Sequence, residues 1–314
     1  MNWTISGLAA LLLTLFTGIS ACAQGAKWET FDNEAGSLYG QGLYDSAVVV
    51  EKKALEVAEQ LGGPDHPGVA TSLNHLAFLY KSLGQYTQAE PLYNRSLAIR
   101  EKTLGPDHPD VATSLNNLAE LYRAQGLYIQ AEPLYKRSLA IREKAFGPDH
   151  PDVATSLNNL ALLYEVQGLY AQAESLYNRS LEIREKALGT DHADVATILN
   201  NLAMLYDAQG KYAKAEPLHK RSLAIREKAL GPDHPDVAAS LNNLALLYHS
   251  QGKYAQAEPL YKRSLAIMEK TLGPDHPDVA TNLENLAALY RKSGREDEAE
   301  PLEKRAAAIR AAQR

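Results

Sequence analysis

Hydrophobic residues recur along this chain at helical spacing, in short segments separated by glycine and proline. From Pro109 to Ala124, apolar side chains fall three or four residues apart, which places them on one stripe of a helix. These side chains are Val111, Leu115, Leu118, Ala119 and Tyr122. A second stripe comprises Ala131, Leu134, Tyr135, Ser138, Leu139 and Ile141. The pattern predicts a pair of amphipathic helices, each with one face toward a core.

The segments between these stripes carry helix start and stop signals. Gly126 separates the two predicted helices, and glycine suits a position that needs positive φ at a helix C-terminus. The second helix is expected to stop at Gly147, which a proline follows. For the next helix we expect Asp149 to be the cap and Pro151 to lie in the first turn, because the missing N–H costs nothing there.

The segment Gly-Pro-Asp-His-Pro recurs with a fixed period. Five copies lie at Gly63–Pro67, Gly105–Pro109, Gly147–Pro151, Gly231–Pro235 and Gly273–Pro277. A variant copy at Gly189–Ala193 fills the gap, so that successive copies begin 42 residues apart throughout. A fixed period of this size is the signature of a repeat architecture, in which each unit is one supersecondary element.

The repeated residues resemble the tetratricopeptide repeat, whose pattern joins a large residue, leucine, a small residue and tyrosine to a later alanine and aromatic residue. The matching residues are Leu115, Leu118, Ala119, Tyr122, Ala131 and Tyr135. The period of 42 and the phrases LNNLA and GPDHPDVA are similar to the repeats of kinesin light chains. The resemblance is strong over residues 63–295 and weak at the flanks. It implies an all-α fold, a right-handed α-solenoid of about seven helix-turn-helix hairpins with a concave groove.

The repeat also predicts how the chain is organised. Residues 63–272 form five regular 42-residue units, residues 27–62 a degenerate N-terminal capping hairpin, and residues 273–314 a C-terminal capping unit. The first hairpin has Glu51 where other hairpins carry an aromatic residue or His219, and the last has Glu296 and Glu303 at tyrosine positions. Terminal repeats lack a neighbour on one side, so polar outer faces are expected there.

Residues 1–23 have the pattern of an export signal. An apolar run from Ile5 to Ile19 is shorter than the roughly 20 residues that span a bilayer. Cleavage after Ala23 would fit a signal peptide, whereas Ile19-Ser20-Ala21-Cys22 resembles the lipobox of bacterial lipoproteins, in which the cysteine is acylated. Cys22 is therefore either a lipidation site or part of a removed signal. In both cases we expect an exported protein, whether periplasmic, secreted or lipid-anchored.

In the resembled family, the first helix of each hairpin lines the concave groove, so the residues between the core stripes are candidates for partner binding. A pair of asparagines recurs at these positions in four successive hairpins, and single asparagines extend the row at both ends. The candidate residues are Asn74, Asn116, Asn117, Asn158, Asn159, Asn200, Asn201, Asn242, Asn243 and Asn285, together with His75, which follows Asn74.

Two interpretations of the asparagine row remain open. Asparagine is about 0.7 kcal/mol worse than alanine inside a helix, so its recurrence needs a reason. An amide offers a donor and an acceptor, and a row of amides can hold the backbone of an extended peptide, as the resemblance to kinesin light chains implies. Alternatively, one asparagine of each pair bonds the neighbouring repeat. We favour the second of each pair for the groove.

Two further positions of the first helices vary from repeat to repeat while the core stays constant. One carries Phe78, Glu120, Leu162, Met204, Leu246 and Ala288. The other, also a candidate partner-binding position, carries Lys81, Arg123, Glu165, Asp207, His249 and Arg291. A constant scaffold with a varied lining is what specificity needs, although drift on a solvated face would give the same pattern.

Composition and motifs exclude most other functions. The net charge of −6, with both signs interspersed, lacks the basic footprint of a nucleic-acid binder. The single cysteine rules out an internal disulfide. One histidine recurs in each repeat, so the histidines of neighbouring repeats are too far apart to bind one metal ion together. We expect these histidines at loops and helix starts. No phosphate-binding or hydrolase motif occurs. We therefore expect neither catalysis nor a cofactor or metal.

The sequence as a whole favours a protein-interaction scaffold, or adaptor, that binds a partner peptide or protein segment in the groove. The alternative is a structural component of an envelope or secretion assembly that uses its convex face or its ends. The sequence identifies no partner, and it offers contact with a membrane only through the possible lipid anchor at Cys22.

Overall fold

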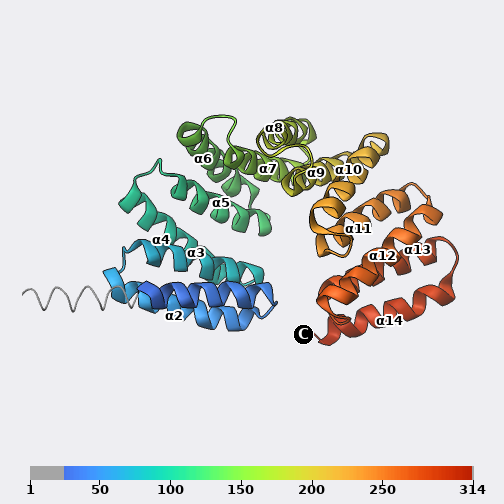
Figure 1. The fold of residues 1–314 in the computed structure, drawn as a ribbon, viewed down its shortest axis with the longest axis horizontal. Helices are drawn as coiled ribbons and strands as arrows, with labels where there is room; N and C mark the ends of the chain where they lie inside the picture. The colour runs from blue at the N-terminus through green and yellow to red at the C-terminus, as the bar shows by residue number, and fades with distance from the viewer. Residues whose placement is uncertain (1–24, 313–314) are drawn as a thin grey trace, which may run out of the picture. The chain divides into compact units, whose positions relative to one another are not determined.

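The computed structural model describes residues 25–312, and within that range every regular element is an α-helix (Figure 1). A helix over residues 25–40 comes first. It is followed by α2 (Tyr44–Gly62), α3 (Pro67–Ser82), α4 (Tyr86–Leu104), α5 (Pro109–Ala124), α6 (Tyr128–Phe146), α7 (Pro151–Val166), α8 (Tyr170–Leu188), α9 (Ala193–Ala208), α10 (Tyr212–Leu230), α11 (Pro235–Ser250), α12 (Tyr254–Leu272), α13 (Pro277–Lys292) and α14 (Glu296–Ala312). None of these described helices combines the length and apolarity needed to cross a membrane.

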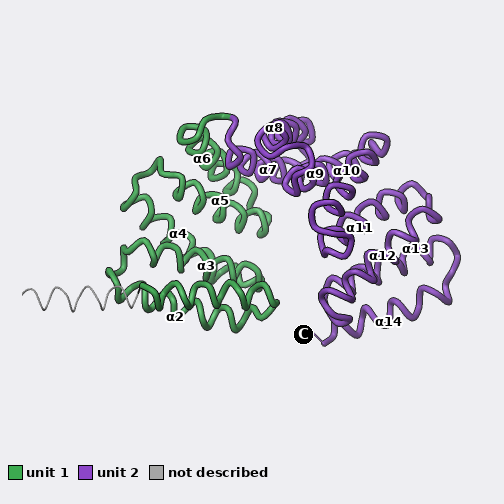
Figure 2. Tube along the Cα trace, viewed as in Figure 1, with its two compact units in different colours: residues 1–148 green, residues 149–314 purple. Residues whose placement is uncertain are grey.

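Consecutive helices pair into hairpins, so the predicted all-α solenoid is confirmed. The chain divides into two compact units, Met1–Pro148 and Asp149–Arg314 (Figure 2). Within each unit the two helices of a hairpin form the most extensive contacts, and the second helix of one hairpin packs on the first helix of the next. The predicted export signal and Cys22 lie outside the described residues.

The first helix of each hairpin from α3 to α13 has a histidine as its N-cap residue. In α5, His108 is the N-cap residue and its Nδ1 accepts a hydrogen bond of 3.1 Å from the Asp110 N–H. The same arrangement occurs at His66, His150, His192, His234 and His276. The prediction of histidine at helix starts is thus confirmed, and Pro151 occupies the first position of α7 as expected.

The expected cap at Asp149 is wrong. His150 occupies the N-cap position of α7, and its ring nitrogen accepts the Asp152 N–H at 3.1 Å. The Asp149 carboxylate instead accepts a hydrogen bond from Lys186 Nζ, at 2.8 Å, at the far end of α8. Because the two helices of a hairpin are antiparallel, the loop before the first helix lies beside the end of the second. The aspartate therefore joins the two ends of the hairpin.

Removing one of these caps should weaken the fold slightly. We expect His108→Ala to lower the free energy of unfolding by about 1 kcal/mol, because the Asp110 N–H loses its acceptor. His108→Asn should retain most of the stability, since asparagine is itself a good N-cap. Urea denaturation followed by circular dichroism measures both. Equal losses for the two variants would show that the ring, and not the cap, provides the stabilisation.

Small residues let the two helices of each hairpin approach closely. Ala119 in α5 and Ala131 in α6 are fully buried, beside the equally buried Tyr135. Ser138 is also fully buried, and its hydroxyl donates a hydrogen bond of 2.8 Å to the Ala112 carbonyl of the partner helix. Equivalent bonds recur from Ser96, Ser180, Ser222 and Ser264. A buried hydroxyl is tolerated here because the neighbouring backbone satisfies it.

Polar contacts between hairpins repeat as regularly as the core does. The Tyr206 hydroxyl of α9 donates to Glu174 of α8 at 2.8 Å, which links one hairpin to the preceding one. Three other pairs repeat this contact: Tyr122 with Glu90, Tyr248 with Glu216, and Tyr290 with Glu258. Second helices are joined as well, by ion pairs such as Arg221 with Glu185 at 2.6 Å. Much of the constancy of the polar residues is therefore explained by stacking.

Candidate binding surface on the first helices

The recurring asparagines form rungs between successive first helices. In unit 2, the Asn201 Nδ2 of α9 donates a hydrogen bond of 2.9 Å to the Asn158 Oδ1 of α7. The same rung joins Asn243 to Asn200 and Asn285 to Asn242, each at 2.9 Å. In unit 1, Asn117 donates to Asn74 at 3.0 Å. Each rung therefore runs from the second asparagine of one hairpin to the first asparagine of the preceding hairpin.

The two asparagines of a pair differ in exposure. Among the first asparagines, Asn74, Asn116 and Asn200 are buried, whereas Asn158 and Asn242 are half-buried. The second asparagines, Asn117, Asn159, Asn201, Asn243 and Asn285, are all half-buried. Both interpretations of the row keep a basis in the structure: the rungs stabilise stacking, and the second asparagine of each pair keeps part of its amide at the surface.

A different pair replaces the asparagine rung at the start of unit 1. His75 occupies the second-asparagine position of α3, and its Nδ1 lies 2.6 Å from the Asp32 Oδ1 of the helix over 25–40. The two residues are 43 positions apart, the same separation as in every asparagine rung. Asp32 and His75 are therefore the first rung of the same row, built from ionisable side chains.

The varied position at the C-terminal end of each first helix contacts the second helix of its own hairpin. Glu165 accepts a hydrogen bond of 2.8 Å from the Tyr177 hydroxyl, and Asp207 pairs with His219 at 2.8 Å. Arg291 pairs with Glu303 in the same way. Burial raises the pKa of Glu165, and the hydrogen bond from Tyr177 opposes that shift.

In the other hairpins, the residues at this position have different partners. Lys81 donates to Glu120 of the next first helix at 2.8 Å. Arg123 lies beside the buried Tyr135 hydroxyl. The His249 ring meets the Tyr254 ring edge-on at 5.6 Å. Variation at this position is therefore tied to contacts within a hairpin or, for Lys81, with the next hairpin. These contacts were not predicted from the sequence.

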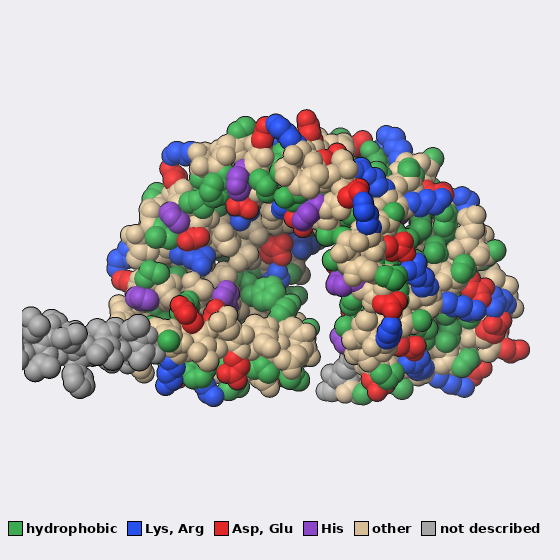
Figure 3. All heavy atoms as spheres, in the orientation of Figure 1, with side chains coloured by type: hydrophobic (Ala, Val, Ile, Leu, Met, Phe, Trp, Pro, Cys, Tyr) green, Lys and Arg blue, Asp and Glu red, His purple; other side chains and the backbone are tan. Residues whose placement is uncertain are grey.

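The other varied position presents apolar side chains to solvent. Phe78, Met204 and Leu246 are exposed, whereas Leu162 is half-buried. In unit 2, a cavity of about 200 Å³ brings together Met204, Asp207, Tyr212, Asn243, Leu246, Leu247 and Ser250. The predicted site residues Asp207 and Asn243 thus share one depression with two exposed apolar side chains. Figure 3 shows acidic and basic side chains interspersed over the visible face of unit 2.

Family models match most of the chain. The model described as tetratricopeptide repeat matches residues 29–102, 68–144, 110–186 and 152–228, and the model described as the Nephrocystin-3 TPR domain matches residues 220–314. The chain belongs to the tetratricopeptide repeat family. This tetratricopeptide repeat chain has no match among curated proteins.

Solved structures agree with this assignment. BtubC (BKLC) from P. vanneervenii is 28% identical, with a TM-score of 0.59, over 74% of this chain and 91% of that chain. A structure from Podosopora anserina, described as a kinesin light chain with nearly identical TPR-like repeats, is 32% identical, with a TM-score of 0.54, over 66% of this chain and 98% of that chain. The tetratricopeptide repeats are thus of the kinesin-light-chain-like type predicted from the 42-residue period.

One cluster in unit 1 was not predicted from the sequence. His75 was a candidate binding residue and Glu51 departs from the repeat, but their proximity to each other and to Asp32 was not expected. The three lie around a cavity of about 440 Å³ at the N-terminal end of the first-helix surface. Burial and the nearby Asp32 carboxylate raise the pKa of Glu51 to about 7. The hydrogen bond to Asp32 raises the pKa of His75.

Proposed function

We propose that this chain is a protein-interaction scaffold that binds an extended peptide segment along the first helices of unit 2. Tetratricopeptide repeat proteins are generally scaffolds of this kind. One observation carries the proposal: the half-buried amides of Asn201, Asn243 and Asn285 lie in a row beside the exposed side chains of Met204 and Leu246. Polar groups for a backbone and apolar contacts for side chains are what such a ligand requires.

The rungs prepare these amides for binding. Each second asparagine uses one N–H to reach the preceding hairpin, so its side chain is held in one orientation before a partner arrives. An asparagine amide has two N–H donors and a carbonyl acceptor, and the rung uses one donor. In Asn243 the Nδ2 also donates to the Met204 Sδ, at 3.9 Å. Because the asparagine side chain is already ordered, peptide binding costs less side-chain entropy than it would with a mobile side chain.

The depression in unit 2 would give the peptide its side-chain preference. Met204 and Leu246 form an apolar wall, and methionine adapts its shape to different ligands. Asp207 lies at the same depression but already has a hydrogen-bond partner in His219. We therefore expect peptides with an apolar residue at the position that enters this depression.

Selection from a displayed library of random peptides on the purified protein would test the proposal. The enriched peptide, labelled with a fluorophore, is then titrated with the double variant Asn201→Ala, Asn243→Ala. We expect its affinity to fall at least about tenfold, because two amides lose both donor and acceptor.

The chain offers a matched control for this experiment. Asn158→Ala together with Asn200→Ala breaks the same two rungs from the opposite ends but keeps the amides of Asn201 and Asn243. Peptide affinity should fall less in the control variant than in Asn201→Ala, Asn243→Ala, because the amides that contact the peptide remain although the rungs that orient them are lost. Equal losses in both variants would assign the asparagines to stacking alone. A selection that enriches no peptide would favour the alternative role in a larger assembly.

A further inference from the structure

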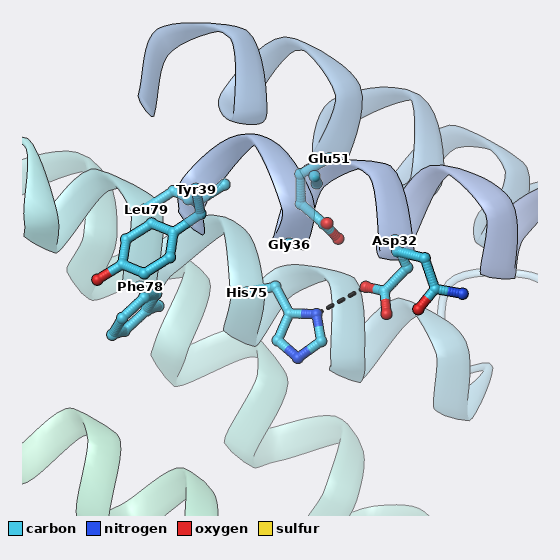
Figure 4. Close-up of a pocket in the computed structure, with 9 residues that line it drawn as sticks. Asp32, Gly36, Tyr39, Glu51, His75, Phe78 and Leu79 are labelled. Carbon is cyan, nitrogen blue, oxygen red and sulfur yellow. Dashed lines mark hydrogen bonds and ion pairs between the residues drawn. The ribbon is translucent and has the colours of Figure 1, made fainter. Parts of the chain in front are cut away.

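Three side chains that break the repeat converge in unit 1. Asp32 comes from the helix over 25–40, Glu51 from α2 and His75 from α3, and all three face one cavity (Figure 4). Their ligand atoms, one from each residue, lie within 4.8 Å of one another. The closest pair is the His75 Nδ1 and the Asp32 Oδ1, at 2.6 Å.

Packing alone does not require these residues. Four other hairpins fill the position of Glu51 with a fully buried tyrosine: Tyr93, Tyr135, Tyr177 and Tyr261. Asparagines occupy the position of His75 in the next five hairpins. Unit 1 thus holds a carboxylate in its first hairpin and an imidazole in its second, at positions where other hairpins carry a tyrosine and an asparagine.

Burial of the Glu51 carboxylate costs free energy, and a bound cation would offset that cost. Its side chain is 1% exposed, and its Oε1 has no hydrogen-bond partner. A buried carboxylate oxygen without a donor is destabilising unless a proton or a cation compensates its charge. The His75 side chain is 46% exposed, so the cavity that Glu51 faces is accessible from solvent.

We propose that Asp32, Glu51 and His75 form a binding site for a divalent transition-metal ion of the Zn²⁺ type. Two carboxylates neutralise the charge of the ion, and the imidazole nitrogen supplies the borderline ligand that favours zinc over calcium or magnesium. Bonds of about 2.0–2.2 Å place tetrahedral ligand atoms roughly 3.3 Å apart. Asp32 and His75 would therefore separate slightly, Glu51 would move inward, and water would complete the coordination. This site is independent of the peptide-binding proposal.

Titration of the purified full chain with Zn²⁺ against a chromophoric chelator tests the site. Every variant carries Cys22→Ser, so that the thiol does not bind the metal. We expect one saturable Zn²⁺ ion per chain, and at least about tenfold weaker binding in Glu51→Tyr and in His75→Asn. His234→Asn is the matched control, because it removes a histidine from an N-cap beside an aspartate but leaves the three proposed ligands in place. Its affinity should equal that of the parent.

The test variants are chosen to keep the fold. Glu51→Tyr and His75→Asn install the residues that the other hairpins carry, and thermal melting in a chelator checks that both remain folded. Zn²⁺ should raise the melting temperature of the parent but not that of Glu51→Tyr, because only the parent gains binding energy in the folded state. Absence of saturable binding, unchanged affinity in folded Glu51→Tyr and His75→Asn, or an equal loss in His234→Asn would each overturn the proposal.

Discussion

Replacing His219 by alanine should lower the free energy of unfolding by about 3–5 kcal/mol, measured by urea denaturation. His219 is 1% exposed within α10, and its Nε2 lies 2.8 Å from the Asp207 carboxylate of α9. Alanine would leave a cavity in the hairpin core and a partly buried carboxylate without its partner. The two effects act together, which places this substitution among the most damaging in unit 2.

The neighbouring hairpins supply the control for this result. Tyr177 and Tyr261 occupy the same position as His219, and the Tyr177 hydroxyl bonds Glu165 as His219 bonds Asp207. His219→Tyr should therefore change stability by less than about 1.5 kcal/mol, because four equivalent positions accommodate a fully buried tyrosine and a hydroxyl donor would face Asp207. If tyrosine were as harmful as alanine, the loss would come from the imidazole itself and not from the cavity and the unpaired charge.

Leu199→Ala should cost about 2–5 kcal/mol, since it removes a fully buried side chain from a dense core. Leu199 belongs to a cluster with Val195, Ala196 and Ile225 in its own hairpin, and Leu181 of the preceding hairpin packs against that cluster. Loss of the leucine therefore weakens both a hairpin and the interface that joins it to its neighbour. Native-state hydrogen exchange should show faster exchange in α8, α9 and α10 together.

The equivalent substitution in α13 should affect a different group of helices. Leu283 occupies the equivalent position of α13 and is likewise fully buried. In a repeat array each hairpin contacts only its neighbours. Leu283 belongs to a cluster with Leu241 of α11, Ile267 of α12 and Ile309 of α14, so Leu283→Ala should speed exchange in α11 to α14 and leave α8 and α9 unchanged. Exchange that rises throughout unit 2 in both variants would contradict this picture and indicate that the unit unfolds as a single cooperative block.

The sequence predicted helix bounds closely because their signals are local. The predicted helix from Pro109 to Ala124 is α5, and Gly126 has the expected positive φ of 74°. The single hydrophobic stripe, however, omitted Ala112 and Leu121, which are also buried. The two residues flank the stripe on opposite edges, because a separation of nine residues is about two and a half turns of the helix. Ala112 clusters with Ile141 of its own hairpin, whereas Leu121 clusters with Leu76 of the preceding hairpin. Periodicity within one helix therefore shows the centre of the buried face more clearly than its edges.

The candidate site was predictable in part. Recurrence singled out the asparagines, but the rungs connect residues 43 positions apart, and that register depends on how successive hairpins stack. Asp32, Glu51 and His75 lie at multiples of the period from Asn74, Tyr93 and Asn117. A comparison of the degenerate first hairpin with the regular units, position by position, would have brought them together. Asp32 was missed because resemblance to the repeat is weak there.

The identical contacts between hairpins bear on how the chain can change in length. The tyrosine–glutamate bond and the asparagine rung join α9 to the hairpin before it. The same two contacts join α11 to the hairpin of α9 and α10. A duplicated or deleted stretch of 42 codons would therefore create a junction whose donors and acceptors already match. Unequal recombination could therefore lengthen or shorten such a gene by whole repeats while the encoded protein stays stable. The terminal hairpins, which carry the unrepeated residues, would not change.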